Sequence, residues 1–202
     1  MQSVTIGNNQ AGQRLDKFLH KYLPNAGTGF LYKMLRKKNI TLNGKKAEGK
    51  EILALNDRVQ CFFSQETFAK FSGREADSFE VTSEVGIDVS QYLQAYESLQ
   101  IPQDAVLYED DHVLVLNKPA GILTQKAGEA DSSLNEWMIG YLLHTQKITA
   151  GELALFKPSV CNRLDRNTSG LVLCGISLKG SQELSKLIRD REVKKYYRTI
   201  VK

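Results

Sequence analysis

Residues 162–170 read Asn-Arg-Leu-Asp-Arg-Asn-Thr-Ser-Gly, and this stretch decides how the whole chain is interpreted. Its last four residues are turn formers, and a short apolar run, residues 171–176, follows at once. Apolar runs of this length flanked by Gly favour a buried strand, so the stretch predicts a loop held by a strand. Asp165 then lies on that loop between Arg163 and Arg166.

An aspartate between two arginines has two interpretations. Neighbouring cations keep a carboxylate ionised where water is excluded, and an ionised carboxylate acts as a nucleophile or a base. The alternative is a structural Arg–Asp pair that holds a turn. The local residues favour the structural pair and leave both open.

Charge is distributed unevenly along the 202 residues, whose net charge is +4. Residues 1–63 carry 11 Lys and Arg against 4 Asp and Glu, and residues 112–202 carry 14 against 8. The intervening residues 64–111 carry 2 against 11. Two basic blocks suit a protein that holds a polyanion at two places. They equally suit two solvated faces, and charge alone favours neither.

The first 63 residues predict a small module of two helices and a sheet. Apolar residues recur at helical spacing in two stripes: Leu15, Phe18, Leu19, Tyr22 and Leu23, then Phe30, Leu31, Met34 and Leu35. Residues 40–42 and 58–63 read as strands, and Asn43-Gly44 as a tight turn. Residues 64–104 are acidic with weak periodicity, and we interpret them as a linker with some local structure.

From residue 105 onward the pattern predicts a mixed, largely antiparallel α/β domain. Residues 106–108 and 113–116 are apolar runs separated by a Glu-Asp-Asp-His turn, as in a hairpin. Ser133 and Glu136 predict a capping box that opens a helix. Ser177 predicts the cap of another helix, with Leu184, Leu187 and Ile188 on its apolar face. Residues 193–201 predict a closing strand.

Several classes of protein are disfavoured. The chain has no run of eighteen apolar residues and no basic segment leading into an apolar one at Met1, so we expect neither a membrane span nor a signal peptide. Cys61, Cys161 and Cys174 form no CxxC pair, and we expect three reduced core thiols in a cytoplasmic protein. Asp110-Asp111-His112 is interpreted as a hairpin turn rather than a metal site.

The N-terminal module resembles the S4 RNA-binding domain in the segment 14–19, the basic second helix and the Asn43-Gly44-Lys45 turn. The resemblance covers about residues 12–63 and implies contact with phosphates and shape of structured RNA. The residues it assigns to RNA are Arg14, Lys17, Lys33, Arg36, Lys37, Lys38, Asn43, Lys45 and Lys46. The alternative is that Arg14 pairs with Asp16 or a neighbouring residue and that the lysines keep a helix soluble.

The second half resembles the RluA-type pseudouridine synthases. Residues 162–170 are similar to their His-Arg-Leu-Asp-x-x-Thr-Ser-Gly motif, residues 109–110 with 117–121 to their upstream motif, and residues 194–196 to their Lys-x-Tyr. The resemblance implies that Asp165 is the catalytic aspartate and that Tyr196 packs beneath the target uracil. The supporting residues it implies are Asn162, Arg163, Arg166, Thr168, Lys118 and Lys194.

Two departures from the family pattern bear on activity. Asn162 stands where the motif has His, which we interpret as a variant of the supporting residues. The family also has an arginine facing the aspartate, supplied by a segment downstream of the Lys-x-Tyr strand. We therefore expect that this chain, ending at Lys202, holds an incomplete catalytic domain.

Together these interpretations predict an α+β protein. It has an S4 module (residues 1–63), an acidic linker (64–104) and the N-terminal part of a synthase domain (105–202). We expect a cytoplasmic monomer that isomerises uridine in structured RNA, ribosomal RNA first, without cofactor or metal. The main alternative is a non-catalytic RNA-binding protein. A hydrolase using Asp165 is more remote, because His20, His112 and His144 lie in unrelated contexts.

Overall fold

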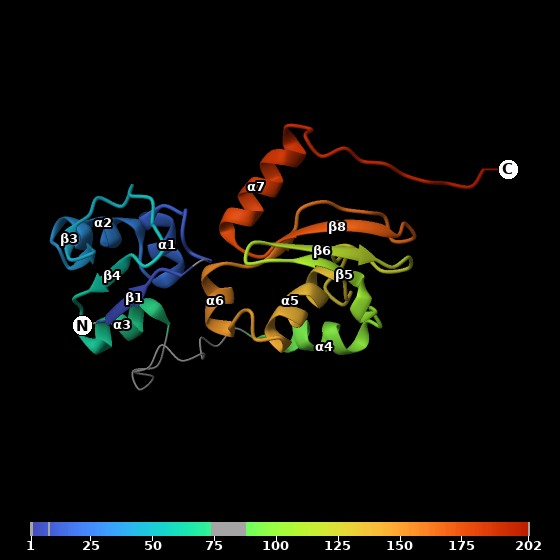
Figure 1. The fold of residues 1–202 in the computed structure, drawn as a ribbon. Helices are drawn as coiled ribbons and strands as arrows, with labels where there is room; N and C mark the ends of the chain where they lie inside the picture. The colour runs from blue at the N-terminus through green and yellow to red at the C-terminus, as the bar shows by residue number, and fades with distance from the viewer. Residues whose placement is uncertain (1, 8, 74–87, 202) are drawn as a thin grey trace.

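The computed structural model describes residues 2–7, 9–73 and 88–201, which form two four-stranded antiparallel sheets with their helices (Figure 1). The first part contains β1 (Gln2–Thr5), α1 (Leu15–Tyr22), α2 (Thr28–Arg36), β2 (Ile40–Leu42), β3 (Lys45–Lys46), β4 (Arg58–Cys61) and α3 (Gln65–Ser72). The second contains α4 (Ser90–Ser98), a 3-10 turn η1 (Gln103–Ala105), β5 (Val106–Glu109), β6 (Val113–Lys118), α5 (Leu134–His144), α6 (Ala150–Leu155), β7 (Ser159–Val160), β8 (Gly170–Gly175) and α7 (Leu178–Arg189).

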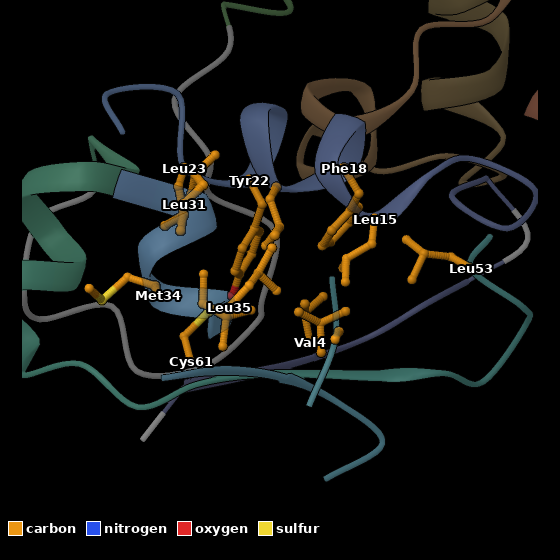
Figure 2. Packing of buried hydrophobic residues seen from close by; sticks show 14 of the residues in the cluster. Val4, Leu15, Phe18, Tyr22, Leu23, Leu31, Met34, Leu35, Leu53 and Cys61 are labelled. Atoms are coloured by element: carbon orange, nitrogen blue, oxygen red, sulfur yellow. The ribbon is translucent and has the colours of Figure 1, made fainter. Parts of the chain in front are cut away.

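The first sheet has the strand order β1-β4-β2-β3 and is covered by α1 and α2. Figure 2 shows Leu15, Phe18 and Tyr22 packing towards Val4 and Cys61 on the strands. All five residues of the first predicted stripe are buried, so that prediction is confirmed. The turn at Asn43-Gly44 is also confirmed, since both residues have positive φ (51° and 72°), as a two-residue hairpin loop requires.

The second sheet has the order β5-β6-β8-β7, with α4 and α5 on one face and α7 on the other (Figure 1). β6 pairs with β8 along its whole length, from Val113 opposite Gly175 to Lys118 opposite Gly170. The predicted hairpin of β5 and β6 is confirmed, and so is the antiparallel character of the sheet. Gly140 permits the close packing of α5 on α4, because a Cβ there would lie 2.2 Å from the Tyr92 carbonyl oxygen.

The two parts of the molecule are joined through α6. Leu155, at the end of α6, is 9% exposed and belongs to the core of the first part. Lys21 of α1 donates from Nζ to the Leu155 carbonyl oxygen at 2.9 Å, and burial lowers the pKa of Lys21. Asn9 donates to the Glu152 carboxylate at 3.3 Å. This join lies far in sequence from residues 64–104, which contain α3 and α4; residues 74–87 lie outside the described residues.

Three details of the prediction are wrong. Ser133 precedes α5, but its hydroxyl donates to Glu136 Oε2 at 2.5 Å and caps no backbone N–H. Ser177 does cap α7, yet of the predicted apolar face only Leu184 is buried, and Leu187 is 37% exposed. Residues 193–201 form no strand, because they pair with no neighbouring strand, and they extend away from the end of α7 (Figure 1).

The three cysteines differ in burial and give a testable expectation. Burial raises the pKa of Cys61 to about 12 and also raises that of Cys174, and both side chains are buried. Cys161 is only half-buried, which corrects the expectation of three core thiols. Because the thiolate is the reactive form, we expect a thiol reagent at pH 8 to modify Cys161 far faster than the other two in the native protein. Mass spectrometry of labelled peptides, with urea-unfolded protein as control, measures this; equal labelling in the native state would contradict it.

Candidate active site

The candidate site is the loop between β7 and β8, which carries Asp165. Asn162 lies at its start and bonds to the backbone of β8 twice. Its Nδ2 donates to the Leu171 carbonyl at 3.1 Å, and its Oδ1 accepts from the Leu173 N–H at 2.7 Å. At the other end the Thr168 N–H donates to the Asp165 carbonyl at 3.0 Å, closing a tight turn. The side chain of Asn162 and the backbone of Thr168 therefore hold the loop on both sides of Asp165.

A second loop, residues 119–124, fixes the residues on either side of Asp165. On one side Thr124 bonds to both backbone groups of Leu164: its hydroxyl donates to the carbonyl at 2.6 Å and accepts from the N–H at 3.1 Å. On the other side the Gly121 N–H donates to the Arg166 carbonyl at 2.8 Å, and Arg166 Nε donates to the Gly121 carbonyl at 3.0 Å. Gly121 has φ +90°, a conformation that favours glycine.

Lys118 connects the two loops through hydrogen bonds from its ammonium group. The residue is 0% exposed, and its ammonium group donates to the carbonyls of Pro119, Ile122 and Arg166 at 2.9, 2.8 and 3.1 Å. An ammonium group has three donors, so all of them are used. Burial lowers the pKa of Lys118, and the nearby carboxylate of Asp165 acts against this. The positive charge of Lys118 therefore lies close to Asp165 and stays buried.

Asp165 itself is exposed at the surface of this braced loop. Within the described part of the chain none of the ion pairs involves Asp165, and the side chain of Arg166 bonds to Gly121 instead. The structural Arg–Asp pair favoured by the local residues is therefore wrong. Arg163 is exposed on the same loop. The arrangement gives a carboxylate that faces solvent on a rigid backbone, as a nucleophile or a base requires.

Lys194 and Tyr196 are not brought to this loop. Tyr196 is 84% exposed and lies on the segment beyond α7. Lys194 is exposed on the same segment. The strand expected over residues 193–201 is absent, since a strand needs a partner for its backbone groups, and so it does not place these two side chains at the loop.

The predicted RNA-contacting residues of the first part fall into two groups. Lys17, Lys33, Arg36, Lys37, Lys38, Lys45 and Lys46 are exposed. Arg14 instead forms an ion pair with Asp16 at 2.7 Å, as the alternative interpretation stated. Asn43 has its side chain committed to Asp57 and to the Arg58 N–H, at 2.8 and 2.7 Å, so it holds the turn of the sheet.

No group of three or more potential metal ligands occurs among the residues that the structure describes. The Asp110 carboxylate accepts from the backbone N–H groups of His112 and Val113, both at 2.7 Å, which confirms the hairpin-turn interpretation of this segment. None of the described helices is long and apolar enough to cross a membrane.

Thr124 and Gly121 contact the backbone beside Asp165 but were not among the predicted site residues. Gly121 lies inside the upstream motif, where a glycine after Pro and Ala signals a turn with positive φ. Thr124 has no such signal, because a threonine in a loop is common and its partner Leu164 lies 40 residues away.

Comparison with known proteins finds a family model for the second part of the chain and relatives that align with nearly all of it. Residues 112–202 match the family model described as RNA pseudouridylate synthase. The ribosomal large subunit pseudouridine synthase C of Vibrio vulnificus (strain CMCP6) is 30% identical over 201 residues, 100% of this chain and 55% of the relative. The protein of the same name from Escherichia coli (strain K12) is 31% identical over 199 residues, 98% of this chain and 54% of the relative.

Among solved structures, human RNA Pseudouridylate Synthase Domain Containing 4 is 20% identical, with a TM-score of 0.36 over 51% of this chain and 35% of that one. Residues 112–202 are thus similar in sequence to RNA pseudouridylate synthases. The chain spans about half the length of the curated relatives it matches.

Proposed function

We propose that this chain isomerises uridine to pseudouridine in ribosomal RNA, with Asp165 as the nucleophile. The observation that carries the proposal is the exposed Asp165 carboxylate on a loop whose neighbouring residues, Leu164 and Arg166, are both held by hydrogen bonds. The names of the relatives, ribosomal large subunit pseudouridine synthases, support the choice of RNA.

The reaction needs little beyond a placed carboxylate. The N1–C1′ bond of the uridine breaks, the base turns, and a C5–C1′ bond forms. C5 loses a proton to solvent and N1 gains one, so atoms and electrons balance without an external acceptor, and we propose no cofactor. Asp165 attacks the base or the sugar, or removes the 2′ proton. The uridine must first leave its stack, which costs a few kcal/mol.

The other residues of the proposed site have supporting roles. Lys118, Asn162, Arg166 and Thr168 hold the loop, and Arg163 lies beside it as a cation for the RNA backbone. In our proposal Lys194 and Tyr196 join the site when residues 193–201 fold against the domain, so that the Tyr196 ring stacks beneath the uracil.

We further propose that residues 1–63 act as an S4-type module that binds structured RNA through the exposed Lys17, Lys33, Arg36, Lys37, Lys38, Lys45 and Lys46. A surface of lysines contacts phosphates without reading bases. Arg14 and Asn43 belong to the same proposed contact set, because both residues are exposed although their side chains also pair within the protein. The proposed protein is a monomer acting in the cytoplasm, and residues 64–104 connect the module to the synthase domain of residues 105–202.

Tritium release from ribosomal RNA labelled at uridine C5 tests the proposal, because forming the C5–C1′ bond expels the C5 hydrogen. We expect release by the chain to exceed that of a no-protein control, and pseudouridine to appear in the nuclease digest of the same RNA. Binding of the RNA without release of tritium would instead support the alternative, a non-catalytic RNA-binding protein.

Reversing charge on α2 tests the RNA contacts. We expect Lys37→Glu with Lys38→Glu to weaken RNA binding about tenfold or more. The steepness of the plot of log K against log salt should fall by about 1 to 2, because fewer phosphate contacts form and fewer counterions are released on binding. A filter-binding titration at several salt concentrations measures this. The matched control is Lys179→Glu with Lys186→Glu on α7, which changes net charge equally; equal losses in both would place the RNA elsewhere.

A further inference from the structure

The side chain that most directly sets the backbone next to Asp165 is Thr124. It is 2% exposed, and its hydroxyl makes two hydrogen bonds to one residue: it donates to the Leu164 carbonyl at 2.6 Å and accepts from the Leu164 N–H at 3.1 Å. The bonded carbonyl belongs to the peptide that links Leu164 to Asp165. Fixing this peptide plane fixes the position of the Asp165 backbone nitrogen and Cα, from which its side chain extends.

The backbone of Thr124 is in turn hydrogen-bonded to residues at the start of α5. Its carbonyl accepts from the Asn135 N–H at 3.2 Å and lies 3.4 Å from the Ser133 hydroxyl. The Ser133 hydroxyl lies closer to Glu136 Oε2, at 2.5 Å, and Asn135 Nδ2 donates to the other oxygen of Glu136 at 3.3 Å. Ser133, Asn135 and Glu136 are all buried. A buried polar network that is fully bonded is rigid, so α5 gives Thr124 a fixed support.

We propose that Thr124 is the positioning residue of Asp165, and that its hydroxyl, rather than its bulk, provides the function. We call the two hydrogen bonds between Thr124 and Leu164 the clamp. The kinetic consequence of the inference rests on the proposed synthase activity, but the clamp itself is a separate property of the loop. Lys118 and Gly121 hold the Arg166 side and Asn162 holds the start of the loop, so the loss of Thr124 would remove the only described side-chain anchor of the peptide before Asp165. Misplacement of a reacting group by about 1 Å can reduce turnover about 100-fold.

Three variants separate the hydroxyl from the volume of the side chain. Thr124→Val keeps the shape and removes both hydrogen bonds, Thr124→Ser keeps the hydroxyl and removes the methyl, and Ser177→Ala removes a buried hydroxyl far from the loop as the control. Amide hydrogen exchange of residues 161–169, read by NMR or mass spectrometry, reports the clamp. Single-turnover tritium release at saturating RNA reports the chemical step, and RNA affinity is measured beside it.

In Thr124→Val we expect exchange of the Leu164 amide to rise at least about tenfold, and single-turnover rate to fall by a similar factor or more, with RNA affinity within about twofold. Thr124→Ser and the control are expected within about threefold of wild type in turnover and in Leu164 exchange. If Thr124→Val does not fold, Thr124→Ser still decides: a loss of turnover there overturns the role of the hydroxyl. Unchanged Leu164 exchange in a folded Thr124→Val overturns the clamp. A wild type without tritium release refutes the synthase proposal, while a rise in Leu164 exchange would still support the clamp.

Discussion

Replacing Asp165 by Ala is expected to abolish pseudouridine formation, by roughly 10³-fold or more, and to leave the fold intact. The carboxylate is exposed and takes part in none of the ion pairs among the described residues, so its removal should change the free energy of unfolding by less than about 0.5 kcal/mol. Loss of a nucleophile removes the step that the rest of the site depends on, which explains the size of the kinetic effect. Tritium release and urea denaturation measure the two quantities.

Asp190→Ala is the matched control for this experiment. Asp190 pairs with Arg189 at 3.2 Å on the surface of α7, away from the loop, and exposed pairs of this kind contribute little. We expect the control to keep wild-type turnover. Asp165→Ala turnover equal to wild type would show that Asp165 is not the nucleophile. A large loss of stability in Asp165→Ala would instead indicate a structural role that the observed contacts do not account for.

The second large effect is expected for Lys118→Met, which should lower the free energy of unfolding by about 3 kcal/mol. Methionine fills a similar volume but removes the donor of the part-buried carbonyls of Pro119 and Ile122, while the Arg166 carbonyl keeps only the Gly121 N–H. Each buried acceptor that loses its partner lowers the free energy of unfolding by about 1 to 3 kcal/mol. Part of this loss is offset, because the variant no longer buries an ammonium charge. Chemical denaturation followed by tryptophan fluorescence of Trp137 measures the change.

Lys179→Met provides the comparison, because Lys179 is an exposed lysine on α7 and surface changes are usually within about 0.5 kcal/mol. Lys118→Met should also lose turnover, since the Arg166 side of the loop loses one of its anchors. A Lys118→Met protein as stable as wild type would contradict the expected cost of removing this donor.

The sequence predicts elements well where the cause is local. The helical stripe of α1, the left-handed turn at Asn43 and Gly44, the cap at Ser177 and the hairpin of β5 and β6 each depend on neighbouring residues, and all are confirmed. Elements that depend on distant partners are predicted poorly. β1 was missed because four residues without a turn signal become a strand only by pairing with β4.

The same distinction explains the errors at the candidate site. Residues 193–201 alternate as a strand should, yet alternation does not supply a pairing partner, and the segment remains unpaired. Ser133 and Glu136 have the spacing of a capping box, but their side chains bond to each other; Thr149 and Glu152 have that spacing too and do form one. The motif located Asp165, whereas the contribution of Thr124 depends on a contact across 40 residues that no pattern announces.

The placement of Leu155 within the core of the first part has a consequence for how RNA would be captured. With a flexible tether, the basic surface and the Asp165 loop would bind RNA independently of each other. The second contact would then cost additional orientational entropy. The join through Leu155, Lys21 and Glu152 is instead formed when the chain folds. An RNA held by the module would then present its uridine at one distance from Asp165. The choice of target uridine would then depend on its distance from the site where the module binds the RNA.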